Sequence, residues 1–353
     1  MKKLYTLLVL TISFSINAQI STNFTVSSGE DASAIGYGTE ASGTSSTAMG
    51  ASTTASGDYS TAMGDSTTAS GNSSTAMGRS TIASGFFSTA IGYGAEQEYI
   101  PGESTPFYRN EALGNYSVVI GNRNKSIEVG SVSIGSDNLS QGAKSLAIGE
   151  NNISTGLYSM AMGLFSESVG DKSFAFGNNA YAGGFNTVAV GSANTIDENA
   201  STNEWSENNR LFVVGNGQYN EETDTLERSD AFTIMFNGNA TLAGNLSVNS
   251  DARLKANIIS LGSTLAKVLQ IDGKSYTMKK DENKKQKIGV LAQDIEKVFP
   301  ELVSESNGVK SVNYQGLVPV LINALKEQDG KMKEQDDKIS RLENLVEKLI
   351  SDK

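Results

Sequence analysis

A pattern of small, apolar and glycine residues repeats along the first half of the chain. The sequence Ser-Ala-Ile-Gly at 33–36 returns four times as Thr-Ala-Met-Gly or Thr-Ala-Ile-Gly at intervals of fourteen residues, and the same spacing runs from Gly121 to Gly191. A second glycine follows seven residues after the first, as at Gly43. This spacing predicts coils of two short strands and two tight turns, in which alternation places Ala48 on the face opposite to its two neighbours.

One coil of this length cannot bury its apolar side chains alone, whereas stacked coils pair their strands and share one core. Counting one irregular unit, we expect twelve coils stacked at roughly 4.8 Å, which makes a rod of about 55 Å. A disordered Ser/Gly linker is the alternative, but disorder does not hold the pattern in register along the chain. We therefore expect a mainly β region over residues 19–195.

The interval from Gly92 to Gly121 departs from the repeat, because its 29 residues are two periods plus one. It contains Tyr99, Pro101 and Phe107, so we expect the chain to loop out of the stack here. Such a loop on a regular scaffold is either a binding site or a tolerated insertion.

Threonines such as Thr53, Thr67 and Thr81 recur once per coil. A row of exposed threonines would suit binding to ice or another crystal surface, which is one alternative function. Any β-roll built from this repeat would produce such rows, so repetition alone does not favour it.

The Ser-x-Ala-[Ile/Met]-Gly units, each with a second Ala-x-Gly, resemble the head repeats of YadA-like trimeric autotransporter adhesins over about residues 28–195. The resemblance implies a left-handed parallel β-roll packed as a trimer. The membrane anchor of those adhesins is not recognised in the sequence, so we do not expect attachment by that route. Residues 196–249 lose the repeat and contain strand-like segments at 210–217 and 231–236, which we interpret as a β connector or shaft.

The composition excludes several kinds of catalytic and metal-binding site. The 353 residues include no Cys and no His, which excludes disulfides, zinc fingers, a Cys nucleophile and a His-based triad. We expect no cofactor, no metal site and no external substrate. The net charge of −11 argues against nucleic acid or an anionic membrane as partner, and no apolar stretch is long enough for insertion into a membrane.

Residues 1–18 have the features of a secretory signal peptide. Lys2 and Lys3 form the basic start, an apolar run spans 4–14, and Ala18 ends the small-residue exit. The sequence therefore predicts a secreted or cell-surface protein.

The composition changes at Ser250. Residues 250–353 carry a net charge of +2, against −15 for 19–249, and helical periodicity appears. Ser-Asp-Ala-Arg-Leu-Lys opens this region, and two further motifs follow at 288–303 and 312–326. In this order they are similar to the endosialidase-type intramolecular chaperone, peptidase family S74, found behind phage tail spikes and fibres. The resemblance implies an α+β chaperone domain.

In that family a Ser/Lys dyad cuts the chain just before the serine after the trimer has assembled. Carried over by position, Ser250 is the nucleophile and Lys255 the base, and the bond between Asn249 and Ser250 is cut. Asp251 and Arg253 match the family motif and would hold the turn as an ion pair. Many relatives have His where this chain has Asn249, which bears on the rate of cleavage. Lysine acts as a base only when neutral, and burial in an assembled interface favours that form.

A long helix is predicted to end the chain, with a coiled coil at about 318–350. Two rows of residues at heptad spacing form the seam, the face through which helices pack in a coiled coil. Two glutamines in these rows make the packing weaker in the middle of the helix. The rows are Val318, Leu325, Met332, Ile339 and Val346, and Leu321, Gln328, Gln335, Leu342 and Leu349. An amphipathic helix that folds onto its own domain is the alternative. The helix does not fix the number of strands, so three chains follow only from the two resemblances.

Together these features predict a secreted homotrimeric, adhesin-like fibre. Its C-terminal domain would drive trimer assembly and then cut the chain once, as a single-turnover serine peptidase. The alternative is a fibre that is not cut, in which the domain stays attached as a permanent trimerisation cap and Ser250 caps a turn. An unidentified surface or matrix ligand is compatible with either.

Overall fold

The computed structural model describes residues 23–94, 109–279 and 284–351. The expected signal peptide and the aromatic residues of the expected loop lie outside the described residues. The chain divides into two compact units between Leu246 and Ser247.

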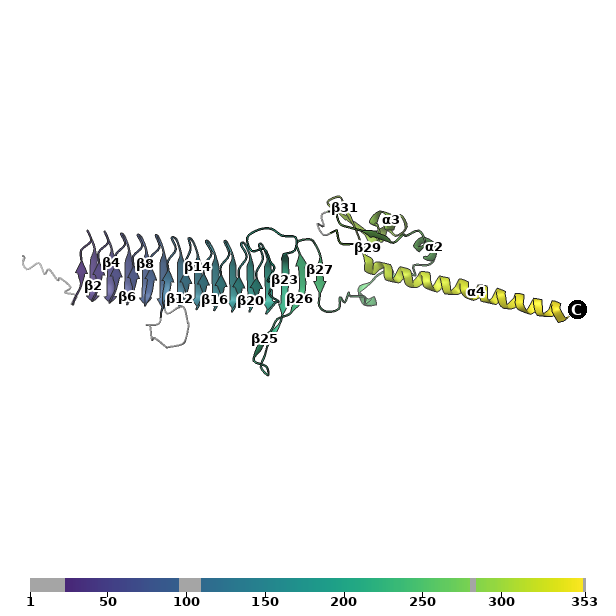
Figure 1. The fold of residues 1–353 in the computed structure, drawn as a ribbon, viewed down its shortest axis with the longest axis horizontal. Coiled ribbons are helices and arrows are strands. Elements are labelled where there is room, and N and C mark those ends of the chain that lie inside the picture. The colour runs from purple at the N-terminus through teal and green to yellow at the C-terminus, as the bar shows by residue number, and fades with distance from the viewer. Residues whose placement is uncertain (1–22, 95–108, 280–283, 352–353) are drawn as a thin grey trace, which may run out of the picture. The chain divides into compact units, whose positions relative to one another are not determined.

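The first unit is a parallel β-solenoid (Figure 1). Each coil contributes a five-residue strand to one sheet and a strand of two or three residues to a second sheet. The long strands are β2 (Ser33–Tyr37), β4 (Thr47–Ala51), β6 (Thr61–Asp65), β8 (Thr75–Arg79), β10 (Thr89–Tyr93), β12 (Val118–Asn122), β14 (Val132–Ser136), β16 (Leu146–Glu150), β18 (Met160–Leu164), β20 (Phe174–Asn178) and β22 (Val188–Ser192). The short strands are β1 (Val26–Ser27), β3 (Glu40–Ala41), β5 (Thr54–Ala55), β7 (Thr68–Ala69), β9 (Thr81–Ala83), β11 (Asn110–Ala112), β13 (Lys125–Ser126), β15 (Leu139–Ser140), β17 (Ile153–Ser154), β19 (Glu167–Ser168) and β21 (Tyr181–Ala182). Equivalent positions of successive coils therefore lie side by side, as the repeat predicts.

The interval from Gly92 to Gly121 forms one coil and not two. β10 pairs directly with β12, with Gly92 opposite Gly121, and β9 pairs directly with β11. The described part of the stack therefore has eleven such long strands, so the expected count of twelve coils is wrong. The sequence between Gly94 and Asn110 therefore adds no further strand pair to the described part of the stack, and the expected loop lies outside the described residues.

Small side chains form the core of the roll. Ala48 and Ala62 are fully buried, whereas Thr47 beside Ala48 is partly exposed, which confirms the predicted alternation. In later coils serine takes the place of alanine in the short strands, and the Ser140 Oγ donates to the carbonyl oxygen of Val132 at 2.6 Å. The two sheets are thus close enough for alanine or serine to fill the space between them.

Two glycines recur in the coils for different reasons, although Glu128 takes the place of the second one in a single coil. Gly64 has a φ of +127°, and a Cβ there would lie 1.9 Å from the carbonyl oxygen of Gly78 in the next coil. Gly57 lacks a positive φ, but a Cβ there would lie 2.2 Å from the carbonyl oxygen of Gly71. At the turn beside Gly57 the left-handed conformation is adopted by Tyr59, with a φ of 57°. The second glycine therefore serves close approach of the coils and not an unusual φ.

The threonine row lies inside the roll. Thr53, Thr67 and Thr81 are all fully buried. The ice-binding alternative is therefore wrong for this row, because it needs these side chains at the surface. In later coils asparagine occupies the same row, and the Asn138 Nδ2 donates to Asn124 Oδ1 at 2.9 Å and to a backbone carbonyl of the next coil at 2.8 Å. These buried amides are hydrogen-bonded from coil to coil, which offsets the cost of their burial.

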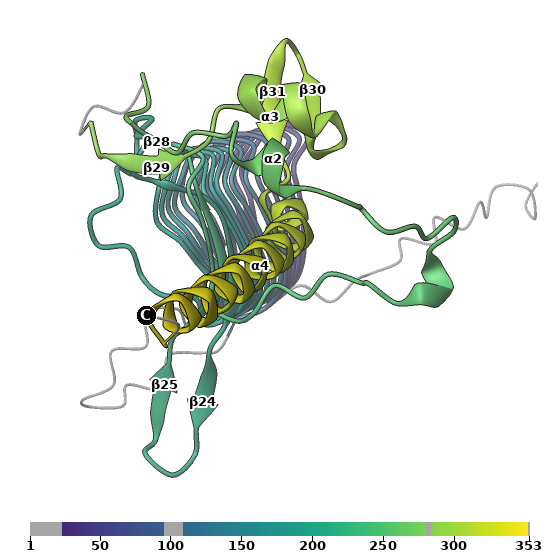
Figure 2. The ribbon, with the colours of Figure 1, turned by 90° about the vertical axis from the view of Figure 1, so that its right-hand side faces the viewer.

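The long-strand sheet continues beyond the repeats. β23 (Arg210–Asn216) pairs in parallel with β22, and β26 (Asp230–Met235) and β27 (Ala240–Leu242) add two antiparallel strands. A hairpin of β24 (Gln218–Asn220) and β25 (Thr225–Glu227) projects from the roll between β23 and β26 (Figures 1 and 2). Both strand-like segments expected in the connector thus form strands.

The second unit is a small α+β domain that ends in a long helix. Its elements are η1 (Ala252–Leu254), α2 (Leu265–Val268), β28 (Lys274–Tyr276), β29 (Lys287–Gly289), α3 (Ala292–Val298), η2 (Pro300–Leu302), β30 (Val303–Ser306), β31 (Val309–Val312), η3 (Tyr314–Gly316) and α4 (Leu317–Ser351). Ile295, Val298, Phe299 and Val320 form its core. The 35 residues of α4 form one uninterrupted helix through Gly330.

Candidate functional site

The expected serine and lysine meet in one short turn at the start of the second unit. The Lys255 Nζ donates a hydrogen bond to the Ser250 Oγ at 2.7 Å. The backbone N–H of Lys255 donates to the carbonyl oxygen of Ala252, which closes the η1 turn between them. A nucleophile within hydrogen-bond reach of a base is the arrangement that serine activation requires.

Asp251 and Arg253 hold this turn together. The Asp251 carboxylate accepts hydrogen bonds from the backbone N–H of Arg253 at 2.9 Å and from its Nη2 at 2.6 Å. The side-chain hydrogen bond lowers the pKa of Asp251 and raises the pKa of Arg253, because it favours the charged form of each. The structure thus contains the ion pair expected from the sequence, and its part in cleavage stays a prediction.

The pair is open to water in a single chain. Every residue from Asn249 to Ser260 is exposed, including both side chains of the pair. A lysine becomes neutral through burial, and within one chain the described residues do not bury this one. The structure therefore brings Ser250 and Lys255 together, but one chain does not supply the burial that would favour a neutral lysine.

α4 carries a long apolar face that its own domain does not cover. Its buried residues are Val320 and Ala324, near its start. The heptad rows face solvent, with Leu325 at 69%, Leu342 at 61% and Leu349 at 69% exposed. The alternative of a seam folded onto its own domain is therefore wrong for a single chain.

The outer face of the long-strand sheet is also apolar. Ile91, Ile120 and Phe176 belong to one row along the roll and are 38%, 40% and 57% exposed. The neighbouring row changes from threonine to Val118 and larger apolar residues in the later coils, up to Phe174. A continuous apolar surface of this kind marks an interaction site.

Two family models match the chain in the same order as the two units. The YadA head domain repeat model, which spans two copies, matches residues 27–53, 41–67, 55–81, 69–95, 140–166, 154–180 and 168–194. The chaperone of endosialidase model, Peptidase_S74, matches residues 250–304. The chain carries YadA head repeats followed by an endosialidase chaperone domain.

Two curated phage proteins are similar to part of the chain. The Long tail fiber protein Gp37 of Salmonella phage S16 is 27% identical over 183 residues, which are 45% of this chain and 24% of that protein. The Long tail fiber protein Gp37 of Enterobacteria phage K3 is 26% identical over 182 residues, which are 44% of this chain and 15% of that protein. The chain therefore spans a quarter or less of the length of these relatives.

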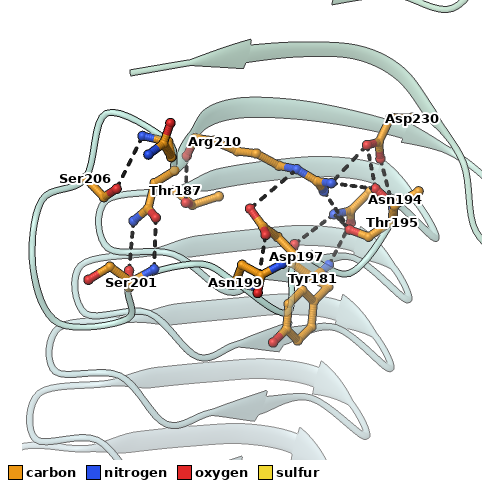
Figure 3. Close-up of polar contacts among 12 residues, drawn as sticks. Tyr181, Thr187, Asn194, Thr195, Asp197, Asn199, Ser201, Ser206, Arg210 and Asp230 are labelled. Carbon is orange, nitrogen blue, oxygen red and sulfur yellow. Dashed lines mark hydrogen bonds and ion pairs between the residues drawn. The ribbon is translucent and has the colours of Figure 1, made fainter. Parts of the chain in front are cut away.

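A polar cluster closes the C-terminal end of the head repeats, and the sequence pattern does not reveal it (Figure 3). The Arg210 guanidinium donates to the carbonyl and to the hydroxyl oxygen of Thr195, both at 2.7 Å. The Asp230 carboxylate accepts from the N–H and hydroxyl of Thr195 at 2.8 and 2.6 Å. The Asn194 side chain bonds the N–H and carbonyl of Tyr181 in the previous coil. These contacts satisfy backbone groups at the end of the stack, where the repeat has no next coil to pair with.

In the described parts of the chain no helix is both long and apolar enough to cross a bilayer. Those residues also contain no group of three or more carboxylates that could hold a metal ion.

Proposed function

We propose that the protein is a secreted fibre of three chains, whose chaperone domain brings the chains into register and then cuts the bond between Asn249 and Ser250. The observation that carries the cleavage is the hydrogen bond of 2.7 Å between Lys255 Nζ and Ser250 Oγ in an exposed turn. Head repeats of an adhesin type and similarity to two tail fibre proteins support an extracellular, fibre-like role.

Two apolar surfaces without a partner in one chain support the assembly. The seam of α4 and the outer face of the long-strand sheet both expose large apolar side chains, such as Leu342 and Phe176. Further copies of the chain would cover both, as heptad helices do in a coiled coil. Joining the chains at α4 first raises their local concentration, which lowers the cost of starting the slow, non-local pairing of the rolls.

The chemistry starts with attack of the Ser250 Oγ on the carbonyl carbon of Asn249. The hydroxyl proton passes to the neutral Lys255 Nζ and from there to the amide nitrogen of Ser250, so that the C–N bond breaks as an ester forms. Water then hydrolyses the ester, which leaves a carboxylate on Asn249 and restores the serine hydroxyl. Because an assembled interface supplies the burial that lysine needs, cleavage follows assembly.

The second candidate is a fibre that is not cut, with the chaperone domain as a permanent cap. The full exposure of the turn and the presence of Asn249 at the position before the serine favour this candidate. It keeps the same assembly and drops only the chemistry.

Intact-mass spectrometry of the purified protein separates the two candidates. Cleavage predicts two species, of which the smaller begins at Ser250, and secretion predicts a mature chain that begins at Gln19. Ser250→Ala and Lys255→Ala should both leave the chain whole without changing its assembly, whereas Ser247→Ala, in the exposed stretch before the turn, should be cut normally. An uncut but assembled wild type would leave only the second candidate.

A further inference from the structure

The β24–β25 hairpin projects from the first unit and forms a sheet of its own (Figure 2). Two backbone hydrogen bonds of 2.9 Å fix its base, from Gly217 to the carbonyl oxygen of Ser192 and from Ser229 to that of Ala193. Tyr219 is 55% exposed. A two-stranded hairpin is only marginally stable by itself in water, so a further surface would stabilise the part of this one beyond its base.

The hairpin is strongly acidic. Residues 218–227 contain four exposed carboxylates and no lysine or arginine. The four are Glu221, Glu222, Asp224 and Glu227. Asp224 accepts a hydrogen bond from the Tyr219 hydroxyl and Glu227 one from Asn220 Nδ2 at 2.7 Å, whereas Glu221 and Glu222 lie at the tip. A basic surface is the complement of this arm.

The opposite edge of the roll carries two exposed lysines. Lys144 and Lys172 occupy equivalent turn positions two coils apart, both with a φ of 56°. Their ammonium groups contact aromatic side chains: Lys144 Nζ donates to the Tyr158 hydroxyl at 2.9 Å, and Lys172 Nζ lies 4.9 Å from the centre of the Phe185 ring. Most other basic residues of the first unit bind its own carboxylates or carbonyls. Lys144 and Lys172 instead contact uncharged aromatic side chains, so their charges can also bind an acidic partner.

The hairpin and the lysines lie at opposite ends of the same strands. The hairpin follows the C-terminal end of β23, whereas Lys172 precedes the N-terminal end of β20, and one strand separates β23 from β20 in the sheet. In a closed ring of identical chains with this sheet turned to the axis, each chain presents one edge to one neighbour and the opposite edge to the next. The hairpin edge of each chain then meets the lysine edge of its neighbour.

We propose that each hairpin binds the neighbouring chain of the assembly and places its carboxylates against Lys172 and Lys144 of that neighbour. The five residues on each side of the hairpin reach about 17 Å. Lys172 lies two strand steps from β23, which is about 10 Å, and Lys144 lies four steps away, which is about 19 Å, so Lys144 is within reach only of the side chains at the tip. The proposed contact rests on the self-association proposed above. In addition, each chain's hairpin would contact the lysine edge of the next chain. This contact would determine which edges of neighbouring rolls pack together and the register between the rolls.

Engineered disulfides test the contact directly, because the natural chain has no cysteine. The full-length chain with Asp224→Cys and Lys172→Cys should form disulfide-linked oligomers on mild oxidation, seen on a non-reducing gel. The matched control combines Asp224→Cys with Ser45→Cys, since Ser45 is exposed at the same turn position with a φ of 52° but lies many coils away. This control, and Asp224→Cys alone, should stay unlinked.

Charge exchange gives a second readout. Glu222→Lys should reduce the linking of the cysteine pair at low salt, and Lys144→Glu in the same chain should restore it, with both effects shrinking at high salt. Light scattering on the same samples separates the two proposals. A monomeric chain would overturn the self-association itself, whereas an assembled chain that links no more than the Ser45 control, or links within one chain, would overturn only the hairpin contact.

Discussion

Gly64→Ala adds one methyl group where two coils of the roll touch. Gly64 has a φ of +127°, and its new Cβ would lie 1.9 Å from the carbonyl oxygen of Gly78, although real Cβ contacts below 3.0 Å essentially never occur. Neighbouring backbone must therefore move by on the order of 1 Å in a close-packed structure. Holding alanine at this φ costs about 1–3 kcal/mol, and each strand hydrogen bond lost by the movement costs about 1 kcal/mol. Together we expect the free energy of unfolding to fall by about 2–5 kcal/mol.

Two further glycines separate the causes. Gly57→Ala meets the carbonyl oxygen of Gly71 at 2.2 Å without a positive φ, whereas a Cβ on Gly244 meets nothing within 4 Å. Denaturant unfolding can be followed by the β signal in circular dichroism. The midpoint denaturant concentration of Gly244→Ala should equal that of the wild type, whereas Gly57→Ala should have a lower midpoint and Gly64→Ala the lowest. If Gly64→Ala unfolds at the same denaturant concentration as Gly244→Ala, the coils do not need glycine for their contact.

Three further predictions concern the site, the helix and the roll. Ser250→Ala and Lys255→Ala should each abolish the fragment that begins at residue 250 in intact-mass spectra, and its appearance from either variant would refute the dyad. Leu342→Asp should weaken assembly by about 3 kcal/mol per helix and shift the sedimenting species toward single chains, whereas an unchanged mass at low concentration would contradict the seam. Burial raises the pKa of Glu167, and the charge of Arg228 opposes this in part. The folded chain thus binds the Glu167 proton more tightly than the unfolded chain does. The contribution of Glu167 to the free energy of unfolding therefore falls as the pH rises from the ordinary pKa of the carboxyl group through the raised pKa. Glu167→Gln should therefore raise the unfolding temperature at pH 7 and leave it nearly unchanged at about pH 3, and a lower unfolding temperature at pH 7 would contradict this.

Local periodicity made most of the roll predictable. Each fourteen-residue unit contains its own two strands and turns, so the burial of Ala48 follows from neighbours in the sequence. The burial of the threonine row does not follow from the pattern, because Thr53 lies in the turn just before a short strand, where simple alternation does not say which way a side chain points. The number of coils differs from the expected twelve because an insertion of about one period has the same length as a coil, so spacing alone cannot distinguish the two.

Contacts between distant residues were not predictable in this way. Arg210, Thr195 and Asp230 form their cluster across separations of 15 and 35 residues, and no spacing in the sequence links them. The turn of Ser250 and Lys255 lies within six residues, so a motif alone could indicate it. The burial that the proposed cleavage needs would come from other chains, so it could not be read from the sequence or from one folded chain.

The mass of the assembled protein tests the central claim most directly. Native mass spectrometry of the full-length Ser250→Ala variant avoids any mixture of cut and whole chains. Three whole chains in one particle is the result predicted by the proposed seam along α4 and the apolar face of the roll. A single chain at micromolar concentration would contradict it.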